Sequence, residues 1–245
     1  MNNGTLPSLQ RSGCSCEKSA NFDFRPKIRG RKFTIYKGKM HSCCNDIQTA
    51  AVKFDSTRKG SKESLEIYIK ESKTAHDIAR KFSKMCNVTI RFPELHLAVM
   101  DEVSFLTNTL SDSRKLSSEE FVLFEPFIKG RLEYFVTCEG IVTKKCPQII
   151  QELCHFSFQD SNGTSLLRGV KGQQIRVNGK HRLQLASPST CVFSEGGCEP
   201  DIRVAVKNFF DTHQCTQRCE KWLNCHLYEK SHLTNFVGSP PPYVS

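Results

Sequence analysis

The sequence predicts an α+β fold, either as one large domain or as two small lobes that share a cleft. Three observations lead to this prediction: short strand-like runs near the start, one long amphipathic segment after them, and an alternation of strand-like and helical segments in the second half. The length of 245 residues and the hydrophobic content of 38% allow a core of ordinary size.

The first half of the chain contains the clearest periodic patterns. Runs rich in β-branched and aromatic residues predict strands over 32–36 and 49–54, joined by a polar, cysteine-bearing turn as in a hairpin. From 62 to 85 the apolar residues recur at helical spacing between Lys, Glu and Arg, which predicts one long helix that ends near Asn87. Residues 1–20, rich in Asn, Gly, Ser and Cys, are expected to be unstructured.

The middle of the chain is predicted to return to strands. We expect strands over 87–92, 95–100 and 121–124, with a polar loop over 107–119. Glu125-Pro126 ends the last of them.

We place the boundary between an N-lobe (21–126) and a C-lobe (127–236) directly after this strand. Residues 237–245 carry three successive prolines and cannot join a packed element. The C-lobe is expected to contain a helix around 146–156, a turn at 160–163, a strand over 164–167 and a helix over 201–210.

A cysteine–histidine motif, H-x-C-x3-C, follows that last helix and predicts a metal site. Zinc prefers thiolate and imidazole ligands in a closed tetrahedron, and His213, Cys215 and Cys219 supply three of them. On a helix, the sulfurs of two cysteines four residues apart would share one face. His155 is our candidate for the fourth ligand. The alternative is that the two cysteines simply pack in a core.

The charge and the cysteine count restrict the class of protein. The net charge of +10 favours anionic partners, but it is spread along the chain, so a solvated basic surface is the alternative. The thirteen cysteines, the lack of a signal-peptide pattern and the lack of an eighteen-residue apolar stretch predict a cytoplasmic, intracellular protein with reduced thiols and no membrane span. The spacing of Cys14, Cys16, Cys43 and Cys44 is poor for a second zinc site.

Several short motifs also follow one another in a recognisable order. They are F-E-P-F-I-K-G at 124–130, H-F-S-F at 155–158, N-G at 162–163, and F-F-x-x-H-x-C-x3-C at 209–219. This order resembles the alpha-kinases, the atypical protein kinases that include elongation factor 2 kinase, the myosin heavy chain kinases and the kinase domains fused to TRP-type channels. The resemblance covers about 22–223.

The resemblance implies a two-lobed protein-kinase-like fold with a zinc-stabilised C-lobe, and ATP as the ligand. Lys53 would contact the nucleotide phosphates and Glu125 would lie at the hinge near the adenine. Taken alone, Lys53 would be read as a surface strand lysine and Glu125 as part of an ordinary turn. His155, His213, Cys215 and Cys219 would hold a structural zinc. Because zinc-finger-type sites bind the metal with about 10–16 kcal/mol, we expect its removal to unfold the C-lobe.

The residues that would perform phosphate transfer depart from the family pattern. The family has D-L-Q-G-V fourteen residues after the histidine of its H-F-T-Y motif, where this chain has G-V-K-G. The aspartate becomes Gly169, the glutamine on the magnesium side becomes Lys171, and Gly172 is kept. Three further family motifs are also altered: L-T-D-P is L-A-S-P at 185–188, K-Y-N-N-N-x-G is Y-F-V-T-C-E-G at 134–140, and G-x-G-N-L-G is E-G-G-C-E-P at 195–200.

These substitutions predict impaired catalysis. Phosphoryl transfer needs oxygen ligands for magnesium and a carboxylate that orients the attacking hydroxyl. Gly169 offers neither, and Lys171 places a positive charge where the cation would bind, so we assign no catalytic residue and doubt a magnesium site. We expect a pseudokinase that binds ATP through Lys53, Glu125, Lys171 and Gly172 and acts through protein partners.

Two alternatives remain open at this stage. The first is an active serine/threonine protein kinase that uses displaced acidic residues. The second is a zinc-containing basic nucleic-acid binder, which would need clustered basic residues with stacking aromatics rather than the scattered charge of this chain.

The C-terminal tail contains a short interaction motif. Pro240, Pro241, Pro242 and Tyr243 fit P-P-x-Y, a ligand of WW domains. Proline pre-sets the extended polyproline conformation and so lowers the entropy cost of binding. The alternative is an idle proline-containing tail.

Overall fold

The computed structural model describes residues 2–5, 19–30, 32–41, 47–101, 115–177, 180–192 and 200–223. Two compact units are found. Unit 1 contains Met1–Lys73, Phe92–Arg131 and Gln184–Ser187, and unit 2 contains Thr74–Arg91, Leu132–Leu183 and Pro188–Ser245. The chain thus passes between the units more often than a single boundary at residue 126 predicts.

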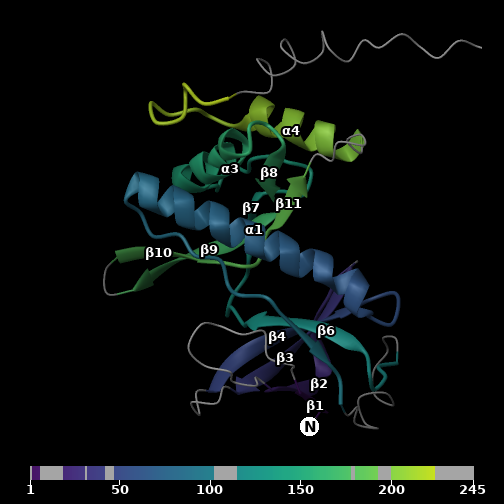
Figure 1. Ribbon diagram of the computed structural model, residues 1–245. Helices are drawn as coiled ribbons and strands as arrows, with labels where there is room; N and C mark the ends of the chain where they lie inside the picture. Colours follow the sequence, from purple (N-terminus) through teal and green to yellow (C-terminus); the bar gives the residue numbers. More distant parts are fainter. Residues whose placement is uncertain are drawn as a thin grey trace, which may run out of the picture. The chain divides into compact units, whose positions relative to one another are not determined.

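Unit 1 is built on one antiparallel sheet of six strands in the order β1-β2-β3-β4-β6-β5 (Figure 1). The four strands predicted from the sequence in this unit at 32–36, 49–54, 95–100 and 121–124 are confirmed. The strands are β1 (Asn2–Thr5), β2 (Ser19–Arg29), β3 (Phe33–His41), β4 (Ile47–Asp55), β5 (His96–Val99) and β6 (Phe121–Pro126).

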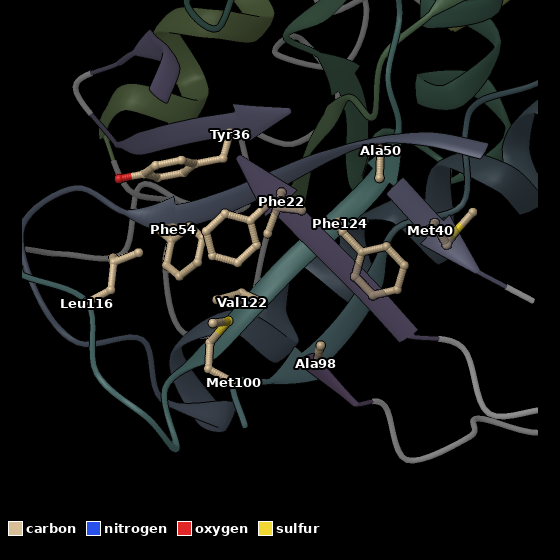
Figure 2. Packing of buried hydrophobic residues seen from close by; sticks show 11 residues of the cluster. Phe22, Tyr36, Met40, Ala50, Phe54, Ala98, Met100, Leu116, Val122 and Phe124 are labelled. Carbon is tan, nitrogen blue, oxygen red and sulfur yellow. The ribbon is translucent and has the colours of Figure 1, made fainter. Parts of the chain in front are cut away.

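The core of unit 1 lies on one face of this sheet. Along β3 the buried and less buried residues alternate with the two-residue period of a strand. The rings of Phe22, Tyr36 and Phe54, from three neighbouring strands, lie 5.1–5.3 Å apart between centroids in tilted or edge-on contacts (Figure 2). Burial of each large side chain contributes about 1.5–3 kcal/mol. The cluster also contains Met40, Ala50, Val52, Ala98, Met100, Leu116, Val122 and Phe124.

The long helix predicted from the periodicity is confirmed as α1 (Lys62–Cys86). Ser61 and Ser64 cap its start reciprocally, because each hydroxyl accepts a hydrogen bond from the other residue's backbone N–H. The helix ends where Asn87 takes a left-handed conformation with φ of 52°.

Among its described residues, unit 2 combines the C-terminal part of α1 and two further helices with two small sheets, β10-β9-β7 and β11-β8. All residues from Ile150 to Phe158 of α3 are buried, so this helix is surrounded by the unit on all sides. The predicted helices around 146–156 and over 201–210 and the strand over 164–167 are confirmed within one to four residues at each end. The elements are β7 (Glu133–Val136), α3 (Gln148–Asp160), β8 (Ser165–Arg168), β9 (Val170–Val177), β10 (Lys180–Leu185), β11 (Ser189–Val192) and α4 (Pro200–Thr212).

Two sequence predictions differ from the structure. The prediction of a strand over 87–92 is wrong, because this segment forms no strand. The hydroxyl of Ser83 contacts both the N–H and the C=O of Ile90. Those backbone groups are the ones that a sheet ladder would use. Within the segment expected to be unstructured, Asn2–Thr5 forms strand β1 against β2.

Some predictions fall outside the described residues. They concern most of the polar loop over 107–119, part of the segment at 195–200, and the tail that carries the P-P-x-Y motif. Among the residues that are described, no helix is long and apolar enough to cross a membrane.

Candidate functional site

Helix α3 supplies the first of the predicted metal ligands, His155. The side chain is fully buried, and its Nε2 lies 2.9 Å from the carbonyl oxygen of Leu223. A carbonyl can only accept, so Nε2 carries the ring proton and donates it. The lone pair is therefore on Nδ1, and the histidine is oriented and in the tautomer that suits a metal ligand.

The other three ligands follow α4 directly. The N–H of His213 donates to the carbonyl of Phe209 over 2.7 Å, and its ring stacks on the Phe209 ring with centroids 4.9 Å apart. Cys215 and Cys219 then lie in an irregular segment with turns rather than on a helix. These cysteines therefore do not share a helix face, but the structure does bring them together with both histidines.

The four ligand atoms converge with the spacing of a tetrahedral site. Zn–N bonds of about 2.0–2.1 Å and Zn–S bonds of about 2.3 Å give tetrahedral edges of about 3.3 Å between nitrogens and about 3.6 Å between nitrogen and sulfur. His155 Nδ1 and His213 Nε2 are 3.1 Å apart. Of the four nitrogen–sulfur distances, that from His155 to Cys215 is 3.8 Å and that from His213 to Cys219 is 3.7 Å. All four ligand atoms lie within 4.8 Å of one another.

The protonation of the cluster also suits a metal. Burial lowers the pKa of both imidazoles, that of His213 to about 4, and the neighbouring His155 ring adds to the second shift. Both rings are thus neutral at pH 7, which is the form that coordinates a metal. Without a metal, burial and then the Cys219 thiol raise the pKa of Cys215 to about 11. A cation would displace this proton because the thiolate is the ligand.

Aromatic rings surround the histidines. The ring of His155 meets Phe210 at 5.1 Å and Trp222 at 5.4 Å between centroids, both edge-on. His213 Nδ1 is buried and has no hydrogen-bond partner among the described residues, so packing on Phe209 orients this ring instead. Such an apolar shell limits access of water to the two histidines, whereas Cys215 is exposed. The donor set and its geometry therefore fit a structural Cys2His2 zinc site.

In unit 1, the two residues expected at the nucleotide lie in contact. Lys53 on β4 and Glu125 on β6 form an ion pair with Nζ and Oε1 2.6 Å apart, and the side chains are only 14% and 7% exposed. The second carboxylate oxygen, Oε2, accepts hydrogen bonds from the hydroxyl (2.5 Å) and the N–H (3.3 Å) of Ser187. Ser187 stands where the aspartate of L-T-D-P was expected. One buried carboxylate therefore holds both the lysine and this serine.

In unit 2, Gly169 alone joins β8 to β9, and residues 170–172 begin β9. Gly169 has a left-handed φ of 63°, and its N–H donates to Thr137 O over 3.1 Å. The ammonium of Lys171 lies 4.2 Å from the centroid of the Tyr134 ring, a cation–π contact. Just before it, Arg168 donates to Cys138 O over 2.6 Å. Residues 168–172 thus carry two cationic side chains and no carboxylate.

Comparison with known proteins identifies the family. Residues 29–219 match the alpha-kinase family. The chain belongs to the alpha-kinase family. The resemblance inferred from its motifs is thereby confirmed, as is an α+β alpha-kinase fold.

Solved alpha-kinase structures share this fold. An alpha kinase from Entamoeba histolytica is 15% identical, with 89% of each chain covered and a TM-score of 0.62. The alpha-kinase domain of myosin heavy chain kinase A in complex with ADP is 13% identical, with 89% of this chain and 93% of that chain covered and a TM-score of 0.62. The same domain in complex with AMP-PNP is 14% identical, with 83% and 87% covered and a TM-score of 0.61. A comparison with curated proteins found no match.

The structure also shows contacts around these side chains that the sequence analysis missed. The motif order indicated the four metal ligands and the Lys53 and Glu125 positions, but not that these last two form an ion pair. It also gave no role to Glu152, a buried carboxylate on α3 that contacts the segment carrying the cysteines. The available signal was polar residues that recur at helical spacing in this segment, Glu152 among them.

Proposed function

We propose that this alpha-kinase-family protein is a pseudokinase: it binds a nucleotide, does not transfer phosphate, holds a structural zinc and acts through protein partners. The observation that carries the proposal is the replacement of the phosphotransfer aspartate by Gly169 and of the magnesium-side glutamine by Lys171.

The local chemistry of this segment supports loss of transfer. Phosphoryl transfer requires oxygen ligands for magnesium and a group that orients the attacking hydroxyl. Gly169 has no side chain, and Arg168 and Lys171 place two positive charges beside it. A cationic segment repels a divalent metal but attracts a phosphate. Loss of a positioned base alone lowers a rate by about 10²–10⁴-fold.

Nucleotide binding is supported by unit 1 and by the relatives. Myosin heavy chain kinase A has been crystallised with ADP and with AMP-PNP. In this chain the lysine expected at the phosphates, Lys53, is present on β4 and is held by Glu125. An incoming phosphate would compete with Glu125 for the ammonium group.

Phosphate transfer from radiolabelled ATP, to the protein itself and to a generic basic substrate, tests the proposal. We expect no transfer with magnesium or with manganese, together with a nucleotide-induced rise in melting temperature. The rise should be lost in Lys53→Ala and kept in the control Lys62→Ala, whose lysine forms an exposed ion pair with Glu66 in the same unit. Transfer that disappears in Lys53→Ala would instead establish an active kinase.

The metal dependence of nucleotide binding provides a second test. If Lys171 neutralises phosphate directly, nucleotide affinity should not change when EDTA is added. Lys171→Gln, which restores the family residue, should weaken binding in EDTA and make it depend on magnesium. A strict magnesium requirement in the wild type would contradict this role of Lys171.

The zinc content of the purified protein tests the metal part of the proposal. Zinc would be held by His155 Nδ1, His213 Nε2 and the sulfurs of Cys215 and Cys219. It would stabilise the fold and take no part in catalysis, because four protein ligands leave no open coordination position. We expect one zinc per chain by mass spectrometry of the purified protein. Protein that is folded and free of zinc would contradict it.

A partner is proposed only for the C-terminal tail, which lies outside the described residues. A peptide with the P-P-P-Y sequence should bind to members of a WW-domain panel, and Tyr243→Ala should abolish this binding. A panel that shows no binder would leave the tail without this role.

A further inference from the structure

The polar side chains of α3 form one stripe that faces the segment carrying the cysteines. We call residues 213–223 the metal loop. It contains three of the four ligands and has only turns as secondary structure. Positions spaced by three, four, seven and eleven residues lie on one side of a helix. The stripe consists of Gln148, Gln151, Glu152, His155 and Gln159, and each of these side chains contacts the metal loop.

The start of the metal loop is held through its backbone. Gln148 Nε2 donates to the carbonyl of Gln214 over 2.9 Å, and Gln151 Oε1 accepts from the N–H of Gln214 over 3.2 Å. Both backbone groups of the residue between His213 and Cys215 are therefore bonded to the helix. His213 and Cys215 therefore lie on either side of a fixed point of the chain.

The middle of the loop is held by a buried carboxylate. Glu152 is only 6% exposed; its Oε1 accepts from the hydroxyl of Thr216 over 2.8 Å and its Oε2 from Arg218 Nη1 over 2.5 Å. The N–H of Thr216 donates in turn to the sulfur of Cys219 over 3.3 Å. The carboxylate thus fixes a residue that hydrogen-bonds to a ligand sulfur, which is how outer-shell groups tune a metal site.

The end of the loop is held in the same way. Gln159 Oε1 accepts from the N–H of Leu223 over 2.6 Å, while the Leu223 carbonyl accepts from His155 Nε2 over 2.9 Å. Leu223 is therefore bonded through both backbone groups to α3, as Gln214 is. The two anchors bracket Cys215 and Cys219.

We propose that Gln151, Glu152 and Gln159 are positioning residues that hold the metal loop in its ligand geometry. The inference rests on the proposed zinc site. Ordering a loop costs conformational entropy at every residue, so a loop that is ordered only when the metal binds would bind the metal more weakly. Because α3 is a buried helix, its side chains order the loop in advance. Glu152 is the central residue, since it reaches Cys219 through Thr216.

Variants of this network separate positioning from ordinary packing. Glu152→Gln removes the charge of the carboxylate, and Thr216→Val removes only the hydroxyl. Glu133→Gln is the control, because Glu133 forms an exposed ion pair with Lys145 in the same unit. Zinc affinity is measured by competition with a chelator of known affinity, with the fluorescence of Trp222, the chain's one tryptophan, as the signal. The absorption of the cobalt-loaded protein reports the ligand geometry.

The expected result is a loss of zinc affinity of about 10–100-fold in Glu152→Gln and a loss in Thr216→Val, with Glu133→Gln unchanged. The zinc-dependent rise in melting temperature should shrink accordingly, because binding to the folded state alone stabilises by mass action. A variant that merely packs poorly would melt lower with and without zinc by the same amount.

Two outcomes would overturn the inference. If the wild type binds zinc and both variants bind it with wild-type affinity, α3 does not position the loop, although the zinc site itself stands. If the wild type binds no zinc, the proposed site fails and the inference with it. If Glu152→Gln does not fold, the zinc affinity of Thr216→Val tests the inference by itself, because this substitution changes only one hydroxyl.

Discussion

At the scale of single residues, the buried carboxylate of Glu125 binds two other polar side chains of unit 1. It holds the Lys53 ammonium on one oxygen and Ser187 on the other, with little exposure to water. The motif order predicted Lys53 and Glu125 as site residues. It could not predict that they are each other's partner, because that depends on the register of β4 and β6, in which Lys53 lies opposite Leu123 and Ala51 opposite Glu125.

Lys53→Ala should therefore destabilise the protein as well as remove a nucleotide contact. Removing one partner of a buried ion pair leaves an uncompensated charge, and we expect a loss of about 3 kcal/mol in the free energy of unfolding of unit 1. The double variant Lys53→Ala/Glu125→Gln should recover part of it. Denaturant unfolding checks this, and Lys62→Ala, at an exposed pair, should cost less than about 1 kcal/mol. Equal stability of Lys53→Ala and wild type would show that the pair contributes nothing.

Ser187 provides a second prediction at this scale. Hydrogen bonds to charged groups contribute about 1.5–3 kcal/mol, so Ser187→Ala should lower the stability of unit 1 by about that amount. Ser187→Asp restores the family aspartate but sets a second carboxylate against Glu125. It should be less stable than Ser187→Ala at pH 7, as measured by chemical unfolding. If Ser187→Asp were as stable as the wild type, the hydrogen bonds between Glu125 and Ser187 would not contribute to stability.

At the scale of elements, the strongly periodic segments were predictable and the irregular ones were not. The apolar spacing of α1 gave both ends of the helix to within two residues. The interval after it looked like a strand because of its Val, Ile and Phe, yet Ser83 occupies the backbone groups of Ile90. The metal loop carries a helix-like cysteine spacing, but α4 ends at Thr212, and the turns after it bring the cysteines to the two histidines. Tertiary contacts decided both cases.

Helix α4 supplies a prediction about an element, because a glycine allows close approach to it. A Cβ at Gly140 would lie 1.9 Å from the carbonyl oxygen of Ala205 on α4, and Gly140 has a φ of +83°. Gly140→Ala should displace α4 and lower the stability of unit 2 by more than about 2 kcal/mol. Thermal unfolding followed by Trp222 fluorescence measures this. Gly163→Ala, at a φ of +80°, is the matched control for strain alone and should cost less.

At the scale of the whole molecule, the two units have different sources of stability. Unit 1 rests on a sheet with an apolar core, in which Tyr36, Phe54 and Phe124 are almost completely buried. In unit 2 the proposed zinc would join α3 to the metal loop, through His155 on the helix and three ligands on the loop. The sequence could indicate the ligands, since their residue types carry the signal. It could not show which unit each segment joins, because that depends on contacts between distant residues.

Removal of the metal should therefore act on one unit and not on the other. Chelation at neutral pH is expected to raise amide hydrogen exchange in α3, α4 and the metal loop, because loss of a structural zinc removes its share of the folding free energy. Exchange in β3, β4 and β6 should change little. Mass spectrometry of proteolytic peptides separates the two units, and adding back zinc should restore protection. Equal deprotection of both units would mean that the metal stabilises the molecule as one cooperative whole, and no change would mean that unit 2 does not depend on it.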